Sequence, residues 1–171
     1  MDDVFLILSI ILLIWILLFF IVELRIIYRY RKSVFLSFNN LDRLLEDRLN
    51  ILNNLLGILY DSNRKMVSKL YKRLEDISYV YNSLDINRKI MENKYIDSKI
   101  DRIFEYKKEL ELTSIDKYNK YEKKLSRIQK VINKAIKKYN ISVSLYNNRM
   151  NVITTRIINK LVRFKEFNYY K

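Results

Sequence analysis

An apolar stretch near the N-terminus limits most strongly what this chain can fold into. From Val4 to Val22 it runs VFLILSIILLIWILLFFIV, and its one polar residue is Ser9. As an α-helix this stretch spans about 28 Å at 1.5 Å per residue, close to the hydrocarbon thickness of a bilayer. A core helix of a soluble protein would present a polar face, and none is found here. We therefore predict a transmembrane helix over residues 4–24, preceded by a short extracytoplasmic N-terminus of residues 1–3.

The residues on either side of the stretch argue against a cleaved secretory signal. Such a signal begins with a basic region and ends at a cleavage site of small residues. Here Asp2 and Asp3 precede the apolar residues, and Glu23, Leu24 and Arg25 follow them. We expect the helix to stay attached.

The orientation of the helix is predicted from the basic residues around it. No Lys or Arg precedes the span, whereas four follow it closely: Arg25, Arg29, Arg31 and Lys32. Cytoplasmic flanks carry an excess of Lys and Arg. We therefore expect a single-pass protein of the cell membrane, integral to the lipid bilayer, with its N-terminus outside and residues 25–171 in the cytoplasm.

The remainder of the chain shows helical periodicity. Apolar residues recur every three or four positions, and with one Gly and no Pro the chain is poorly suited to the tight turns of sheets. The predicted fold is all-α: the transmembrane helix continues into an antiparallel three- or four-helix bundle with long, coiled-coil-like helices over residues 25–171. The first stripe comprises Val34, Phe38, Leu41, Leu45, Leu49, Leu52, Leu56 and Leu59.

Polar clusters indicate where the helices end. Gly57 and the cluster at residues 61–63 predict the first break, and residues 63–111 form either one bent helix or two. Thr113, followed by Asp116, resembles a capping box that starts the last helix. The stripe of that helix is predicted to run unbroken through Tyr118, Tyr121, Leu125, Ile128, Ile132, Ala135, Tyr139, Val143, Tyr146, Met150, Ile153, Ile157, Leu161 and Phe164.

A Tyr-Asn pair occurs twice within this last helix, seven residues apart. Tyr139 and Tyr146 lie on the apolar stripe, and Asn140 and Asn147 lie at its margin. The favoured interpretation is packing, with the rings in the bundle and the amides bridging neighbouring helices. A row of ligand-binding side chains is the alternative.

Residues 134–164, KAIKKYNISVSLYNNRMNVITTRIINKLVRF, resemble the C-terminal signature of the LemA family. That signature has YN-x5-YN, a short apolar stretch and a final Phe. The corresponding residues are Tyr139, Asn140, Tyr146, Asn147, Ile157, Ile158, Leu161 and Phe164.

A second stretch, RLNILNNLL at residues 48–56, is similar to the family's Arg-x-Asp-Leu-Ile-Pro-Asn-Leu-Val. Asn50 replaces the usual Asp, and Asn53 and Thr154 replace customary prolines. The matching residues are Arg48, Ile51, Leu52, Asn54 and Leu55. The resemblance implies a membrane-anchored bacterial helical bundle and no established enzymatic activity.

Arg48 is the one charged residue of this second motif. It comes next to the apolar stripe, between Leu45 and Leu49, so its head can reach the margin of the bundle. There it would donate to Asn side chains or to a carboxylate on a neighbouring helix; the alternative is an exposed surface arginine. With the family resemblance, we expect a structural polar layer of Arg48, Asn54, Asn140 and Asn147.

The formal net charge of +14 is concentrated in the last third of the chain. One side of the last helix is nearly all basic: Lys117, Lys120, Lys124, Arg127, Lys134 and Lys138. This face is a solvated surface, or it attracts anionic lipid, nucleic acid or an acidic protein. Nucleic acid is disfavoured as a partner, because no recognition motif is present and no exposed aromatic residues are expected among the lysines.

The residue types argue against catalysis and metal binding. The chain has no His and no Cys, and its single Gly excludes a phosphate-binding loop. Asp97 and Asp101 share a helix face but are flanked by lysines, which predicts a surface position. We expect no catalytic residue, no metal and no cofactor. The predicted function is a LemA-like, non-enzymatic scaffold or accessory protein that binds an unknown protein partner or itself; the alternative is a basic bundle that binds anionic lipid or nucleic acid non-specifically.

Right-side-out vesicles test the predicted orientation. We expect residues 25–171 to resist external protease while the membrane is intact and to be degraded once detergent opens the vesicles. Immunoblotting with a C-terminal epitope tag measures this, and degradation in intact vesicles would reverse the assigned topology.

Overall fold

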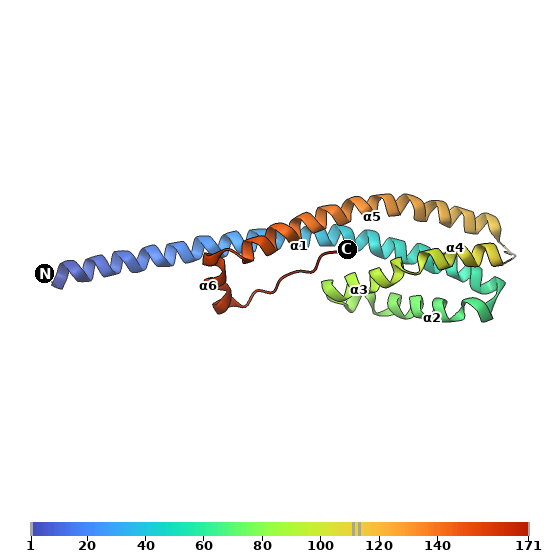
Figure 1. Ribbon diagram of the computed structural model, residues 1–171, viewed down its shortest axis with the longest axis horizontal. Coiled ribbons are helices and arrows are strands. Elements are labelled where there is room, and N and C mark those ends of the chain that lie inside the picture. The colour runs from blue at the N-terminus through green and yellow to red at the C-terminus, as the bar shows by residue number, and fades with distance from the viewer. Residues whose placement is uncertain (1, 111, 113, 171) are drawn as a thin grey trace. The chain divides into compact units, whose positions relative to one another are not determined.

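The computed structural model describes residues 2–110, 112 and 114–170, with the side chains of Asp2, Asp3 and Ile153 excepted. These residues contain α-helices and one short 3₁₀ helix, and no strand (Figure 1). The predicted all-α fold is confirmed. The elements are α1 (Asp2–Ser62), α2 (Arg64–Val80), η1 (Tyr81–Ser83), α3 (Ile86–Asp97), α4 (Ile100–Glu109), α5 (Ile115–Met150) and α6 (Ile153–Val162).

The chain divides into two compact units. Unit 1 contains Met1–Ser37 and Asn140–Tyr169, and unit 2 contains Phe38–Tyr139 and Tyr170–Lys171. The sequence predicts one body over residues 25–171, whereas the structure divides these residues between both units. The reason is that α1 and α5 each contribute to both units, while α6 belongs to unit 1 and α2, α3 and α4 belong to unit 2.

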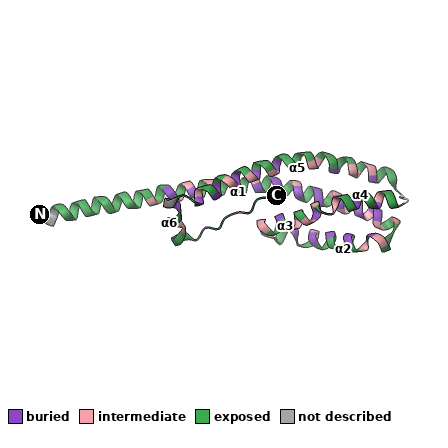
Figure 2. Ribbon diagram, in the orientation of Figure 1, coloured by how far each residue is buried: buried purple, intermediate pink, exposed green. Residues whose placement is uncertain are grey.

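The N-terminal part of α1 is not covered by any other described part of the chain. None of the side chains at residues 4–22 is buried (Figure 2). Among the described residues, α1 is the one helix that is long and apolar enough to cross a membrane. Large apolar surfaces of this kind are stable in hydrocarbon and not in water. One candidate membrane-spanning helix is therefore present, as predicted.

The later part of α1 forms the centre of unit 2. It passes through Gly57 without a break and ends at Ser62, after which the Asn63 side chain accepts a hydrogen bond from the backbone N–H of Met66 and caps α2. The first stripe is buried as predicted. Its buried members are Val34 in unit 1 and Phe38, Leu41, Leu45, Leu49, Leu52, Leu56 and Leu59 in unit 2.

Helices α2 and α5 run antiparallel to α1 within unit 2. Asn53 of α1 donates to Ser78 of α2 at 2.6 Å, and the Tyr60 and Tyr71 rings stack 4.7 Å apart. The residue number thus falls along α2 as it rises along α1. The same is true of α5, because Phe38 contacts Tyr139 at 5.6 Å between ring centroids and Arg48 donates to Gln129 at 3.3 Å.

The stretch from Arg64 to Glu109 contains three α-helices, α2, α3 and α4, whereas the sequence left one or two open for residues 63–111. The second begins at the N-cap Asp85, whose carboxylate accepts from the N–H of Arg88. Helix α3 runs parallel to α1, because Lys89 binds Asp42 and Asn93 binds Arg48. The predicted cap at Thr113 lies outside the described residues.

The last helix is not continuous, and the prediction of an unbroken stripe to Phe164 is wrong. Helix α5 ends at Met150, and the N–H groups of Asn151 and Val152 bond to carbonyls three residues back. The Asn151 side chain also donates to the carbonyl of Asn147, which competes with the helical pattern. After the break the chain bends into α6, where Ile157 and Leu161 are exposed.

Five of the buried tyrosines predict a loss of stability at alkaline pH. They are Tyr81, Tyr118, Tyr139, Tyr146 and Tyr170. Burial raises the pKa of each phenol above its ordinary value of 10.0, because desolvation disfavours the phenolate. The unfolded chain then releases protons near pH 10 that the folded chain retains, so the free energy of unfolding falls as pH rises above about 10. Denaturant unfolding at several pH values, followed by circular dichroism, measures this. Stability that is constant through this range would contradict it.

Candidate functional site

Arg48 is fully buried in unit 2 and is bonded to residues of two other helices. Its guanidinium donates to the carboxylate of Asp97, to Asn93 Oδ1 at 2.9 Å and to Gln129 Oε1 at 3.3 Å. Asn93 and Asp97 are on α3, and Gln129 is on α5. Arg48 is thus bonded to an Asn side chain and to a carboxylate of α3, and it is not an exposed surface arginine.

These contacts continue into a larger polar cluster, which we call the Arg48 network. Asn93 Nδ2 donates to the Tyr81 hydroxyl at 2.9 Å, and that hydroxyl donates to Asp42 at 3.1 Å. Lys89 Nζ reaches the same carboxylate at 2.6 Å. Burial, together with the charge of Asp42, raises the pKa of Tyr81, so its hydroxyl keeps the proton that it donates.

The last described residue completes the Arg48 network. The Tyr170 hydroxyl donates to Asp97 at 2.8 Å and accepts from Arg48 at 3.5 Å. Tyr170 is 3% exposed. The network contains two cations, Arg48 and Lys89, and two carboxylates, of Asp42 and Asp97, so its formal charges balance. Balanced and bonded charges are the form in which ions are tolerated inside a protein.

The second Tyr-Asn pair holds an extended C-terminal segment in unit 1. Asn147 Nδ2 donates to the carbonyl of Phe167 at 2.9 Å, and Asn147 Oδ1 accepts from the Phe167 N–H at 3.2 Å. The Tyr146 hydroxyl donates to the carbonyl of Lys165 at 3.2 Å, and its ring packs edge-on against Phe167. The packing interpretation of the tyrosines is therefore confirmed. Asn147, however, binds a backbone segment instead of a neighbouring helix.

Of the four residues predicted to form a polar layer, Arg48 and Asn54 belong to unit 2, and Asn140 and Asn147 belong to unit 1. Asn54 is exposed and donates to the carbonyl of Asn50 on its own helix at 2.7 Å. Asn140 is half-buried on α5. Tyr139 is buried against Phe38.

Phe164 contacts Arg31, one of the four basic residues after the span, in unit 1. Phe164 is buried and packs edge-on against Tyr28 at 5.4 Å. The Arg31 guanidinium lies over the Phe164 ring at 5.4 Å, which is a cation–π distance. Arg31 thus has a packing role as well as a charge. The remaining basic residues of this set, Arg25, Arg29 and Lys32, are exposed.

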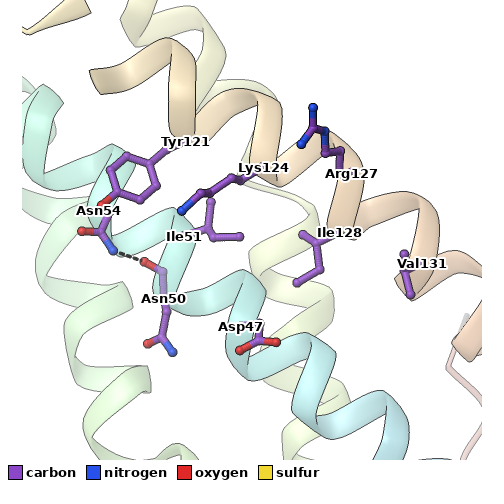
Figure 3. Close-up of a pocket in the computed structure, with 9 residues that line it drawn as sticks. All are labelled: Asp47, Asn50, Ile51, Asn54, Tyr121, Lys124, Arg127, Ile128 and Val131. Carbon is purple, nitrogen blue, oxygen red and sulfur yellow. Dashed lines mark hydrogen bonds between the residues drawn. The ribbon is translucent and has the colours of Figure 1, made fainter. Parts of the chain in front are cut away.

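A groove of about 540 Å³ lies between α1 and α5 in unit 2 (Figure 3). The side chains of Ile51, Ile128 and Val131 are apolar, and Lys124 extends across the groove toward Ile51 in Figure 3. The residues that line it are Asp47, Asn50, Ile51 and Asn54 of α1, and Tyr121, Lys124, Arg127, Ile128 and Val131 of α5. The groove combines apolar area with two exposed cations, Lys124 and Arg127, and one exposed carboxylate, Asp47.

The described part of the chain contains no group of three or more acidic side chains placed to hold a metal ion. The Arg48 guanidinium makes its hydrogen bonds with side chains of the protein itself. These hydrogen bonds join α1 to α3 and α5.

Sequence reasoning missed the partners of Arg48. Asp97 was predicted to be a surface residue, yet its side chain is 36% exposed and paired with Arg48. The signal that could have identified these partners is the spacing of Lys89, Asn93 and Asp97. They recur every four residues and so form a polar face on α3. Tyr170 carried no such signal, because it belongs to a segment without regular structure.

No family model matches the chain, and no curated protein or solved structure is significantly similar to it.

Arg48→Ala tests the structural role of the network. Its removal leaves Asp97 and Asn93 without their main donor, and breaking a buried pair costs about 3 kcal/mol at the lower end of the usual range. We choose the lower end because Asp97 is partly exposed. Thermal unfolding of the full chain in lipid nanodiscs, followed by circular dichroism, measures the loss.

The matched control is Arg88→Ala. Arg88 is 73% exposed and pairs with an exposed Asp85 at 3.6 Å, so its removal should change the free energy of unfolding by less than about 1 kcal/mol. Equal unfolding temperatures for Arg48→Ala and the unmodified chain would show that the network does not stabilise the fold.

Proposed function

We propose that this chain is a single-pass protein of the cell membrane whose helical part acts as a non-enzymatic scaffold in the cytoplasm. The observation that carries the proposal is the contrast within α1. None of its side chains at residues 4–22 is buried, whereas its later part contributes the buried stripe of unit 2. A helix of this kind joins a lipid environment to a folded one. The basic residues from Arg25 to Lys32 support the cytoplasmic placement.

The positions of the motif residues support a LemA-like architecture. Arg48, Tyr139 and Tyr146 are almost fully buried, and Asn147 is 8% exposed. Arg48, Tyr146 and Asn147 make side-chain hydrogen bonds that depend on residue type. A motif whose members fix packing in this way is a signature of architecture, which agrees with a scaffold and gives no reason to assign a reaction.

The groove between α1 and α5 is the proposed docking surface of the scaffold. We assign it to an acidic, amphipathic segment of a partner protein. Ile51, Ile128 and Val131 would contact the apolar side of that segment, while Lys124 and Arg127 would pair with its carboxylates. Charge complementarity of this kind sets the association rate and selects among partners more than it sets affinity.

A second candidate function follows from the exposed lysines of α5. The six basic residues predicted to share one side of α5 are all exposed: Lys117, Lys120, Lys124, Arg127, Lys134 and Lys138. Such a face attracts anionic lipid or nucleic acid without specificity. Non-specific attraction differs from groove docking in one respect: each of these six basic residues should contribute about equally to binding.

Site-specific cross-linking distinguishes the two functions. A photo-reactive amino acid at Val131, in the full chain in native membranes, should give a protein adduct of defined mass. Lys124→Glu with Arg127→Glu should abolish the adduct, because the partner's carboxylates would then meet carboxylates. Lys120→Glu with Lys134→Glu, a change of equal charge among the same six residues but outside the groove, should preserve it.

A charge exchange completes the test. Replacing the acidic residues of the captured segment with lysine should restore the adduct with the Lys124→Glu and Arg127→Glu chain. An equal loss in both pairs of variants would favour non-specific attraction, and an adduct insensitive to all four substitutions would exclude groove docking.

A further inference from the structure

Helix α6 has an apolar surface that no described part of the chain covers. Ile157 is 62% exposed and Leu161 is 72% exposed, although both are large aliphatic residues. Thr155 and Ile158, in contrast, are 0% and 2% exposed. The helix therefore packs on the protein through one face and presents isoleucine and leucine on another.

Basic residues flank the exposed pair. Arg156 and Lys160 precede Ile157 and Leu161 by one position each, and all four are exposed. On an α-helix, residues three or four apart are surface neighbours, so Lys160 lies beside both Ile157 and Arg156. Arg163, which follows the helix, is exposed as well. Apolar residues bordered by Lys and Arg are typical of helices that lie at the surface of a membrane.

Helix α6 is tied to the end of the apolar span. Glu23 directly follows residues 4–22 and is buried. Its carboxylate pairs with Arg149, at the end of α5, and accepts from Thr154 Oγ1, in the first turn of α6, at 3.4 Å. A residue bonded to Glu23 lies within a few ångströms of the hydrocarbon boundary when residues 4–22 cross the bilayer. Helix α6 therefore begins at the depth of the lipid headgroups.

The direction of α6 fits the same location. Both α6 and the first part of α1 belong to unit 1, and α6 runs across the direction of α1 in Figure 1. When α1 crosses the bilayer, a helix that crosses α1 at Glu23 lies along the membrane surface. The residues after α6 pack on the part of α1 beyond the span, because Phe164 contacts Tyr28.

We propose that α6 is an interfacial helix that inserts Ile157 and Leu161 into the leaflet next to Glu23, while Arg156 and Lys160 bind anionic lipid headgroups. The apolar side chains replace contact with water by contact with acyl chains. The bilayer is therefore the ligand of this surface. Its acyl chains match the apolar side chains of α6, and its anionic headgroups match the basic ones. This inference rests on the proposed membrane anchoring by residues 4–24 and adds a second membrane contact to it.

Tryptophan fluorescence of the full chain in vesicles tests the inference. The chain has one Trp, Trp15, inside the span. In a Trp15→Phe background, Leu161→Trp places the fluorophore on the exposed face of α6. In vesicles of phosphatidylcholine and phosphatidylglycerol, we expect its emission to shift to shorter wavelength and to be quenched by lipids brominated on their acyl chains.

A matched reporter and the native Trp separate the possible outcomes. Tyr79→Trp, in the same background, replaces a side chain of α2 that is 92% exposed, and its emission should remain that of Trp in water. Quenching of native Trp15 without quenching of the Leu161→Trp reporter would overturn the interfacial helix and leave the anchoring intact. If Trp15 itself is not quenched, the proposed anchoring fails. Equal quenching at positions 79 and 161 would also overturn the inference, because the contact would not belong to α6.

The basic residues are tested in the same chain. Arg156→Glu with Lys160→Glu should reduce the quenching of the Leu161→Trp reporter in vesicles that contain phosphatidylglycerol and change it little in phosphatidylcholine alone. An equal effect in both kinds of vesicle would exclude the assigned role in binding anionic headgroups.

Discussion

The interior of unit 2 is organised by one buried positive charge. The Arg48 guanidinium has no access to water, so the protein must supply both a counter-charge and hydrogen-bond acceptors. Asp97 and Asn93 on α3 provide them, with Gln129 on α5 as a further acceptor. This requirement fixes which face of α3 meets α1. It also gives the end of the chain a place to bind, since the Tyr170 hydroxyl contacts the same pair of ions.

The sequence was sufficient for features that depend on periodicity. The apolar stretch at residues 4–22 predicts the exposed first part of α1, and the leucine stripe predicts the buried face of its later part, because side chains three and four apart share one face of a helix. The polar cluster before Arg64 marked the first break correctly. The sequence allowed the burial of Arg48 without requiring it, since a position between Leu45 and Leu49 is compatible with an inward or an outward side chain.

Features that depend on single backbone hydrogen bonds could not be predicted in the same way. The break after Met150 arises where the Asn151 side chain bonds to the carbonyl of Asn147, while the apolar spacing continues past it without a change. The helix that follows ends at Arg163 in a left-handed conformation, a role that glycine usually fills. The extended segment beyond it has no period at all. Its position depends on the hydrogen bonds between Asn147 and Phe167. The sequence around Asn147 had predicted a contact with a neighbouring helix instead.

The pairing of Asn147 with Phe167 has a consequence for how such a contact evolves. Both hydrogen bonds of the amide go to main-chain atoms, and every residue except proline has the same two groups. Selection for these bonds therefore acts on the asparagine alone. A substitution opposite it needs no compensating change, so correlated variation among homologous chains would carry no record of these two bonds.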